Sequence, residues 1–90
     1  MEVSFTGQFK KAYQKRVLNG TISEAAFRQT LEIFIADPFD VKLKTHKLSG
    51  RLKGLFSFSI TYSLRVVFYF TRDRPQKAIF VSIGDHDEVY

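Results

Sequence analysis

The sequence contains no cysteine, and this absence excludes several kinds of chemistry at once. Disulfide bonds, thiolate metal sites and cysteine nucleophiles all require a thiol, and a chain without one is compatible with a reducing compartment. No run approaches the roughly 18 apolar residues of a membrane span, and the first residues lack the apolar core of a secretion signal. These absences predict a soluble, cytoplasmic protein that does not engage a membrane.

Acidic residues are missing from one long window of the chain. Between Val41 and Arg72 there is no Asp or Glu, whereas seven of the fourteen basic residues lie there. The rest of the chain holds seven basic and nine acidic residues, so the formal net charge of +5 originates in this window. A local positive field of this kind indicates a negatively charged partner.

The size and composition are those of one small globular domain, residues 1–90. A chain of 90 residues is near the size at which folding buries only about 60% of the unfolded surface. Its hydrophobic fraction of 44%, with ten Phe and four Tyr, is sufficient for a core without disulfide or metal staples. We therefore expect an autonomously folded unit.

Two helices are predicted in the first part of the chain. Thr6 offers a cap to the first helix, which ends at Asn19-Gly20. Thr21 and Glu24 have the spacing of a capping box for the second helix, which ends at Asp37-Pro38. The apolar positions of the two helices are Phe9, Tyr13, Val17, Phe27, Leu31, Phe34 and Ile35.

Strands are predicted on both sides of the helical pair. Glu2–Phe5 alternates as a short edge strand, and the basic stretch 39–53 reads as a loop with a short strand near 44–48. From residue 55 the period is two, which predicts a hairpin that turns at Tyr62-Ser63. A last strand, Ala78–Ile83, is predicted with Ile79, Val81 and Ile83 inward and Phe80 outward.

These elements predict an α+β fold. Two antiparallel N-terminal helices pack on one face of a small, mainly antiparallel sheet of three to four strands. On the second hairpin strand, Arg65 and Tyr69 alternate with the apolar residues and face the other way. The face with Ser57, Ser59, Arg65 and Tyr69 is thus the open face, and we expect function there.

Several common sites are poorly supported by the sequence. The segment Gly50–Gly54 lacks the Walker A pattern. The two histidines, His46 and His86, are forty residues apart, and Asp85, His86 and Asp87 form only a weak local cluster for a metal. Nothing resembles the strained nucleophile turn of a Ser-His-Asp hydrolase. We therefore predict no metal and no cofactor.

The remaining candidates are cationic or proton-carrying side chains, and this set suits a phosphodiester. Arginine grips two phosphate oxygens at once, and lysine supplies a mobile charge. Histidine exchanges protons at neutral pH, and aromatic rings stack on unpaired bases. The candidates are Lys42, Lys44, His46, Lys47, Arg51, Lys53, Tyr62, Arg65, His86 and Tyr90.

Each candidate also has a structural interpretation. Lys42, Lys44 and Lys47 are equally well read as a solvated basic loop, and His46 as a turn cap. Arg65 is alternatively an ion-pair partner of Asp85 or Asp87. His86 is either an exposed residue of raised basicity or a proton donor, and Tyr90 is alternatively a frayed end. Sequence alone leaves these alternatives open.

The order of elements and four segments resemble the RelE/ParE toxin superfamily of type II toxin–antitoxin systems, most closely the YafQ/RelE-type mRNA interferases. The segments are His46–Gly50, Leu55–Ile60, Leu64–Tyr69 and Ile83–Tyr90. The resemblance covers nearly the whole chain. Most of it rests on the R-V-V-F of the second hairpin strand together with the I-G-x-H-x-x-V-Y of the last segment.

The resemblance implies a ribosome-dependent endoribonuclease that cuts mRNA without a metal, through attack of the 2′-hydroxyl on the adjacent phosphate. It also implies an acidic antitoxin partner and contacts with ribosomal RNA. By position, Arg65 matches the phosphate-stabilising arginine, His86 the C-terminal acid or phosphate ligand, and Tyr90 the C-terminal tyrosine. His46 matches a candidate general base, and Lys53 is the alternative base. Lys42, Lys44, Lys47, Arg51 and Tyr62 are expected to contact RNA or the ribosome.

The sequence also departs from the pattern it resembles. Related chains often carry another His or Asp at the hairpin turn, where this chain has Tyr62-Ser63-Leu64. ParE-type members share the fold, lack the catalytic histidines and poison DNA gyrase. The alternatives are therefore a ParE-like gyrase inhibitor and a degenerate, non-catalytic toxin module. The two histidines favour RNA cleavage.

Overall fold

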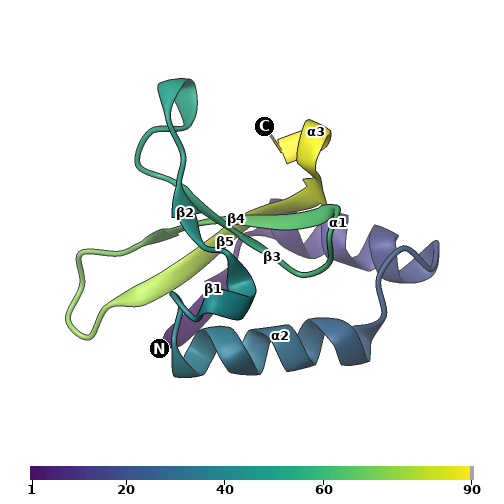
Figure 1. Cartoon of the computed structure of the whole chain (residues 1–90), viewed down its shortest axis with the longest axis horizontal. Helices are drawn as coiled ribbons and strands as arrows, with labels where there is room; N and C mark the ends of the chain where they lie inside the picture. Colours follow the sequence, from purple (N-terminus) through teal and green to yellow (C-terminus); the bar gives the residue numbers. More distant parts are fainter. Residues whose placement is uncertain (90) are drawn as a thin grey trace.

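A mixed five-stranded sheet with strand order β1-β5-β4-β3-β2 forms the centre of the protein (Figure 1). The structure is a computed structural model that describes residues 1–89, with the side chains of residues 87 and 88 left out. The strands are β1 (Glu2–Phe5), β2 (His46–Lys47), β3 (Phe56–Ser59), β4 (Leu64–Phe70) and β5 (Lys77–Asp85). β1 pairs in parallel with β5, and the other pairs are antiparallel.

The sheet therefore differs from the predicted one in two respects. It has five strands in the described chain rather than three to four, because the two-residue β2 joins β3 at the edge. It is mainly antiparallel as predicted, but it contains one parallel pair at the other edge, where β1 lies beside β5, and is therefore a mixed sheet. β2 pairs with the next strand along the chain, whereas β1 pairs with residues 77–80, far away in sequence. The local alternation of residues encodes neither pairing.

The two long helices have the predicted extents. α1 (Gly7–Leu18) is capped by Thr6, whose hydroxyl accepts a hydrogen bond from Phe9 N at 3.0 Å. α2 (Glu24–Ala36) is capped by Ser23, which accepts from Ala26 N at 3.0 Å. The predicted cap, Thr21, is wrong: its backbone N–H donates to the Asn19 side chain in the turn before the helix. In Figure 1, α2 runs opposite in direction to α1.

Both helices pack on one face of the sheet and enclose an aromatic core. Phe34 of α2 is fully buried, with its ring centroid 5.0 Å from Phe58, 5.0 Å from Phe68 and 5.1 Å from Phe80. Phe9 of α1 lies 5.6 Å from Phe80. The predicted stripe of α2 is wrong at Ile35, which is 42% exposed. Consecutive side chains of a helix point about 100° apart, so Ile35 is turned away from the core that the Phe34 ring enters.

A bulge changes the orientation of part of β5: Ile83 faces the core as predicted, whereas Ile79 and Val81, also predicted inward, are not part of the core. Phe68 pairs with Phe80, but Val67 pairs with Ser82, so Val81 is an extra residue on β5. Phe80, predicted outward, is therefore fully buried, and Ile83 faces the same core beyond the bulge. The strict period of two fails here because one inserted residue switches the face of every residue after it.

Short helical segments complete the described chain. They are the 3₁₀ segments η1 (Val41–Leu43) and η2 (Gly50–Leu52), and the final turn α3 (His86–Val89). None of the helices in residues 1–89 has the length and apolar character that crossing a membrane requires. Figure 1 shows α3 and the loop that carries η2 on the side of the sheet away from α2.

Candidate functional site

The sheet face opposite the helices forms the floor of the candidate site. Register places His46, Ser57, Val67 and Ser82 in one row across four strands, and Ser59, Arg65 and Gly84 in a second row. The loop after β2 and the α3 turn rise at its two ends (Figure 1). The predicted open surface is wrong at Ser57, which is 0% exposed, because the His46 ring lies against its hydroxyl.

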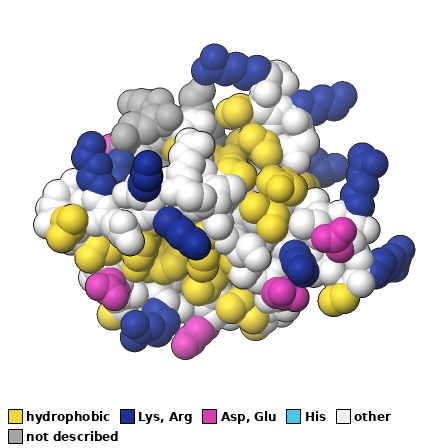
Figure 2. Space-filling view, turned by 180° about the vertical axis from the view of Figure 1, so that it is seen from behind, with side chains coloured by type: hydrophobic (Ala, Val, Ile, Leu, Met, Phe, Trp, Pro, Cys, Tyr) yellow, Lys and Arg dark blue, Asp and Glu magenta, His cyan; other side chains and the backbone are white. Residues whose placement is uncertain are grey.

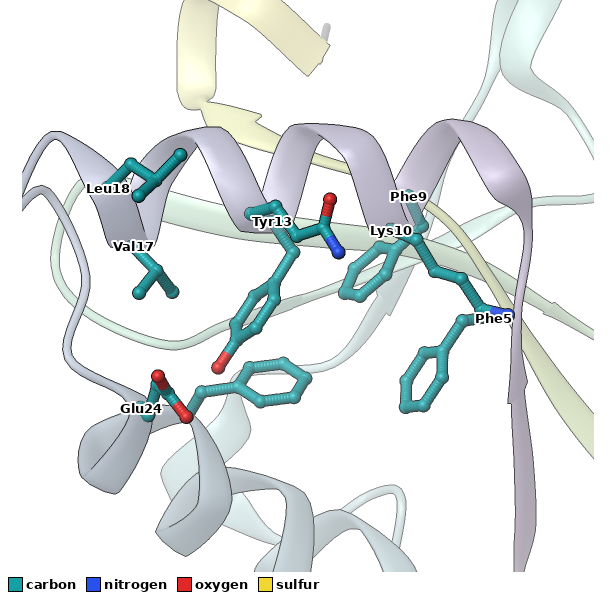
Figure 3. A pocket seen from close by; sticks show the side chains of 9 residues that line it. Phe5, Phe9, Lys10, Tyr13, Val17, Leu18 and Glu24 are labelled. Carbon is teal, nitrogen blue, oxygen red and sulfur yellow. The ribbon is translucent and has the colours of Figure 1, made fainter.

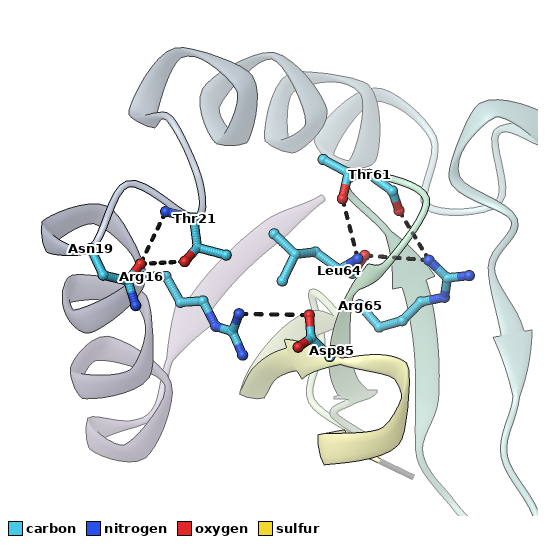
Figure 4. Close-up of polar contacts among 7 residues, drawn as sticks. All are labelled: Arg16, Asn19, Thr21, Thr61, Leu64, Arg65 and Asp85. Carbon is cyan, nitrogen blue, oxygen red and sulfur yellow. Dashed lines mark hydrogen bonds and ion pairs between the residues drawn. The ribbon is translucent and has the colours of Figure 1, made fainter.

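Arg65 lies at the β4 end of this face and is turned onto the preceding hairpin turn. Its Nη1 donates to the carbonyl oxygen of Tyr62 at 2.8 Å. It also donates to Thr61 O at 3.0 Å, with a longer contact to Leu64 O at 3.4 Å (Figure 4). The proposed ion pair of Arg65 with Asp85 is not what the structure contains. Asp85 pairs with Arg16 of α1 at 3.7 Å.

His86 opens α3 next to the same hairpin turn. Its backbone N–H donates to Ser63 O at 3.1 Å, and its side chain is exposed. The turn therefore lies between Arg65 and the first residue of α3. Tyr90, the other C-terminal candidate, and the side chain of Asp87 lie outside the residues that the structure describes.

His46 lies at the opposite side of the face, on β2. Its Nδ1 is 3.1 Å from Lys44 O, and its Nε2 is 3.5 Å from Ser57 Oγ. A carbonyl only accepts hydrogen bonds, so Nδ1 carries the proton and Nε2 is the basic nitrogen of the neutral ring. Two strand spacings of roughly 4.8 Å and two residues separate His46 from Arg65 in register, which puts their Cα atoms about 12 Å apart.

The remaining basic candidates lie on η1, on β2 and in the loop after β2, the segments next to His46 in the chain. Lys42 lies in η1, Lys44 follows it with a left-handed backbone, and Lys47 pairs with Phe56. The loop after β2 carries Arg51 and Lys53. All five side chains are exposed, and so is Tyr62, at 94%. The structure thus places the basic residues on one flank and Arg65 with His86 on the other.

Two polar residues at this face were not identified from the sequence as part of the site. Ser57 contacts His46 only through strand register, which the sequence does not reveal. Thr61 closes the turn beneath Arg65, since its hydroxyl accepts from Leu64 N at 3.2 Å. A threonine three residues before the N–H that it accepts is typical of a turn closed by a side chain, and this spacing could have indicated Thr61. Among the side chains that the structure describes, those of residues 1–86 and 89, no group of three or more His, Asp or Glu has a metal-binding arrangement.

A second concave feature lies on the other side of the sheet, between α1, α2 and β1. This apolar groove has a volume of about 510 Å³, and the residues that line it are Phe5, Phe9, Lys10, Tyr13, Gln14, Val17, Leu18, Glu24 and Phe27. Figure 3 shows the Tyr13 hydroxyl directed toward Glu24. Burial raises the pKa of Tyr13 above its ordinary value, the Glu24 carboxylate raises it further, and Arg28 opposes both.

The arrangement of these elements defines the class of fold: the chain has the RelE/ParE-type toxin fold. A metal-bound toxin from Helicobacter pylori superposes with a TM-score of 0.80 at 21% identity, covering 100% of this chain and 99% of that one. YafQ from Escherichia coli superposes with a TM-score of 0.79 at 16% identity, covering 99% and 97%. The YoeB/ParE toxin from Agrobacterium tumefaciens has a TM-score of 0.74 at 19% identity, covering 96% and 99%.

YafQ is also present in a structure described as the DinJ–YafQ toxin–antitoxin complex. No protein-family model matches this sequence, and no curated protein does. The similarity to these toxins is therefore one of fold.

Proposed function

We propose that this protein is the toxin of a type II toxin–antitoxin system and cleaves mRNA on the ribosome by a metal-independent mechanism. The observation that supports this most is the grouping of Arg65 and His86 around one hairpin turn, facing a basic flank in a window without acidic residues. The structural neighbours are described as toxins, which agrees with the proposed role. A substrate on the ribosome places the protein in the cytoplasm.

The proposed reaction assigns one step to each side chain. His46 accepts the proton of the 2′-hydroxyl at Nε2, since Nδ1 is held by the Lys44 carbonyl; Lys53 is the alternative base. The 2′-oxygen then attacks the phosphorus, and Arg65 stabilises the added negative charge of the phosphorane. His86 protonates the leaving 5′-oxygen, and Tyr90 stays a catalytic candidate from the sequence alone. The products are a cyclic phosphate and a free 5′-hydroxyl.

Cleavage of mRNA during translation tests this function. Arg65→Ala and His86→Ala are each expected to lower the cleavage rate on the order of 100-fold, the usual cost of losing one charge-stabilising or proton-transferring group. Primer extension on mRNA from a purified translation reaction measures the effect. If wild type and both variants cut mRNA equally, the site assignment is wrong. If wild type leaves translated mRNA intact, the proposed activity is wrong.

A ParE-like gyrase inhibitor is the second candidate function. It is favoured by the superposition with the YoeB/ParE toxin. Inhibition of DNA gyrase supercoiling by the purified protein, with translated mRNA left intact, selects this alternative. A chain that neither cuts mRNA nor inhibits gyrase, and whose expression leaves growth unchanged, is a non-catalytic toxin module.

The antitoxin partner is expected to occupy the apolar groove between α1, α2 and β1. Leu18, at the end of α1, is 88% exposed beside it. α1 has no acidic residue and carries exposed lysines at 10, 11 and 15. Figure 2 shows the side of the molecule behind the view of Figure 1, where hydrophobic side chains gather among charged ones. An amphipathic helix with an apolar stripe and an acidic flank fits such a groove.

A matched pair of substitutions tests this docking surface. Leu18→Glu places a charge at the groove, and Val41→Glu places one at a similarly exposed position, 86%, on η1. Losing one buried leucine contact weakens binding by about 1.5–3 kcal/mol, at least tenfold in the dissociation constant. Calorimetry with the antitoxin, which we expect to be a small acidic protein encoded beside this one, measures both affinities. Equal affinities of the two variants contradict the groove assignment.

A further inference from the structure

The turn that joins β3 to β4 is closed without any help from Arg65. Thr61 Oγ1 accepts the N–H of Leu64 at 3.2 Å, and the N–H of Ile60 donates to Leu64 O at 3.0 Å. The Leu64 side chain is only 2% exposed, so the end of the turn is fixed to the core. The carbonyl groups of Thr61, Tyr62 and Ser63 are therefore held in set directions although the turn itself is exposed.

Arg65 donates hydrogen bonds to the Thr61 and Tyr62 carbonyls from one end of its guanidinium group. Among the described side chains and backbone, all hydrogen bonds of the Arg65 side chain come from Nη1, and the two shortest go to Tyr62 O and Thr61 O. Figure 4 shows the contact with Thr61. A guanidinium carries five N–H donors in a rigid plane. With Nη1 held by the turn, Nε–H and the two Nη2 N–H groups form the edge that presents paired donors to a ligand.

The next carbonyl of the same turn holds the start of α3. Ser63 O accepts the backbone N–H of His86 at 3.1 Å. The carbonyls of Thr61 and Tyr62 thus accept from the Arg65 guanidinium, and the carbonyl of Ser63 accepts from the backbone of His86. The relative placement of the two residues depends on one turn, and the side-chain contact that closes this turn is made by Thr61.

We infer that Thr61 is a positioning residue, which closes the turn so that its carbonyls preset the Arg65 guanidinium for two-pronged binding of a phosphodiester. The identity of the ligand rests on the proposed function. A long arginine side chain otherwise loses several rotamer freedoms when it binds a ligand, and anchoring one end of its guanidinium removes part of that cost beforehand. A small displacement of such a group lowers the rate of the reaction it assists.

The first experiment measures the anchoring in the free protein, without any assumption about activity. Thr61→Val and Thr61→Ala both remove the acceptor, whereas Thr61→Ser keeps it. In protein labelled with ¹⁵N-arginine, wild type and Thr61→Ser are expected to show resolved, slowly exchanging Nη signals of Arg65, assigned through Arg65→Lys. In Thr61→Val and Thr61→Ala these signals are expected to broaden and exchange faster. Unchanged Nη signals in both variants overturn the inference.

The second experiment measures the consequence for cleavage of translated mRNA, at temperatures where each variant is fully folded. Thr61→Val is expected to lower kcat/KM by about 10- to 100-fold, as a misplaced group does, and Thr61→Ser is expected to remain near wild type. Equal cleavage by wild type and Thr61→Val overturns the positioning role. If wild type itself cuts no mRNA, the proposed function fails, and the NMR comparison still decides whether Thr61 anchors Arg65.

Discussion

At the scale of single residues, Lys44 shows how the backbone prepares the candidate site. Within residues 1–89 it is the one non-glycine residue with a positive φ, 53°, and its carbonyl accepts the Nδ1 proton of His46. A left-handed backbone costs a residue with a Cβ atom about 1–2 kcal/mol, and branching at Cβ adds to this. The left-handed turn at Lys44 is therefore a local strain that directs a carbonyl to the histidine.

Substitution of Lys44 is expected to separate backbone from side-chain effects. Lys44→Gly relieves the strain, whereas Lys44→Val increases it, so the free energy of unfolding of the Val variant should be lower by about 1–2 kcal/mol. Urea unfolding with an unchanged m value measures the difference. Lys42→Val, at an exposed residue of η1 with a negative φ, serves as the control. Equal stability of Lys44→Gly and Lys44→Val would contradict the strained backbone.

Tyr13 gives a prediction for alkaline pH. Its pKa is raised above the ordinary value of 10.0 by burial first and by Glu24 second. An acid whose pKa is higher in the folded state holds its proton there after the unfolded chain has released it, so stability is full below pH 10 and falls as the pH rises above it. Tyr13→Phe is expected to remove the part of the stability loss at alkaline pH that the Tyr13 phenol causes.

Denaturant unfolding of wild type and Tyr13→Phe across this pH range measures the effect. Tyr69→Phe, which alters a tyrosine that is 38% exposed on the other face, controls for the loss of any phenol. The stability of Tyr13→Phe should decline less steeply than that of the control. Parallel declines in the two variants would show that Tyr13 does not titrate differently in the folded protein.

At the scale of elements, the cap of α2 can be tested by comparing Ser23, the observed N-cap, with Thr21, the cap expected from the sequence. Ser23 accepts Ala26 N, and its replacement by Ala is expected to lower stability by about 1 kcal/mol. Ser23→Asp retains a hydrogen-bond acceptor and should preserve most of the stability that the cap contributes. Thr21→Ala, at the cap expected from the sequence, should cost less than Ser23→Ala. Thermal and urea unfolding of the three variants decide the order, and a larger loss at Thr21 would reverse the assignment.

The same scale shows which parts of the fold the sequence makes predictable. Both long helices can be predicted because apolar spacing and helix-ending residues are local signals, although the N-cap of α2 is Ser23 and not Thr21. β3 and β4 can be predicted because their alternation is regular. The faces of β5 cannot, because the extra residue Val81 reverses them. The parallel pairing of β1 with β5 cannot be predicted either, since residues 2–5 meet residues 77–80 only after the chain has folded.

For the candidate site, alternation predicts only where a side chain points. The position of Arg65 opposite the apolar residues of β4 correctly places it away from the helices. Its partners are backbone carbonyls, and carbonyls are the same in every residue, so no sequence pattern marks Thr61 and Tyr62 as its acceptors. The contact of His46 with Ser57 likewise depends on strand register.

At the scale of the whole molecule, stability depends on the ring cluster around Phe34. Its centroid lies about as close to three strand phenylalanines as aromatic packing allows, and the ring is fully buried. Phe34→Ala is expected to cost about 3–5 kcal/mol, a large part of the 5–15 kcal/mol typical of a small domain. Phe39→Ala, at a ring that is 57% exposed, should cost markedly less. Equal losses measured by urea unfolding would contradict this core.

The distribution of charge over the whole molecule gives the last prediction. Replacing Lys47, Arg51 and Lys53 together by Gln removes three charges from the flank near His46. Replacing Lys10, Lys11 and Lys15 removes the same number from α1, on the other side of the sheet. Each lost phosphate contact reduces the slope of log K against log salt by about 0.7 for single-stranded nucleic acid, so the first variant should lose about 2 units of slope.

Fluorescence anisotropy with a single-stranded RNA oligonucleotide at several salt concentrations measures these slopes. The α1 variant should keep the slope of wild type, because its charges lie beyond a Debye length of about 8–10 Å from RNA held on the opposite face and are screened there. Equal loss of slope in both triple variants would mean that RNA responds to net charge alone. In that case the acid-free window would describe the composition of the protein and not its binding surface.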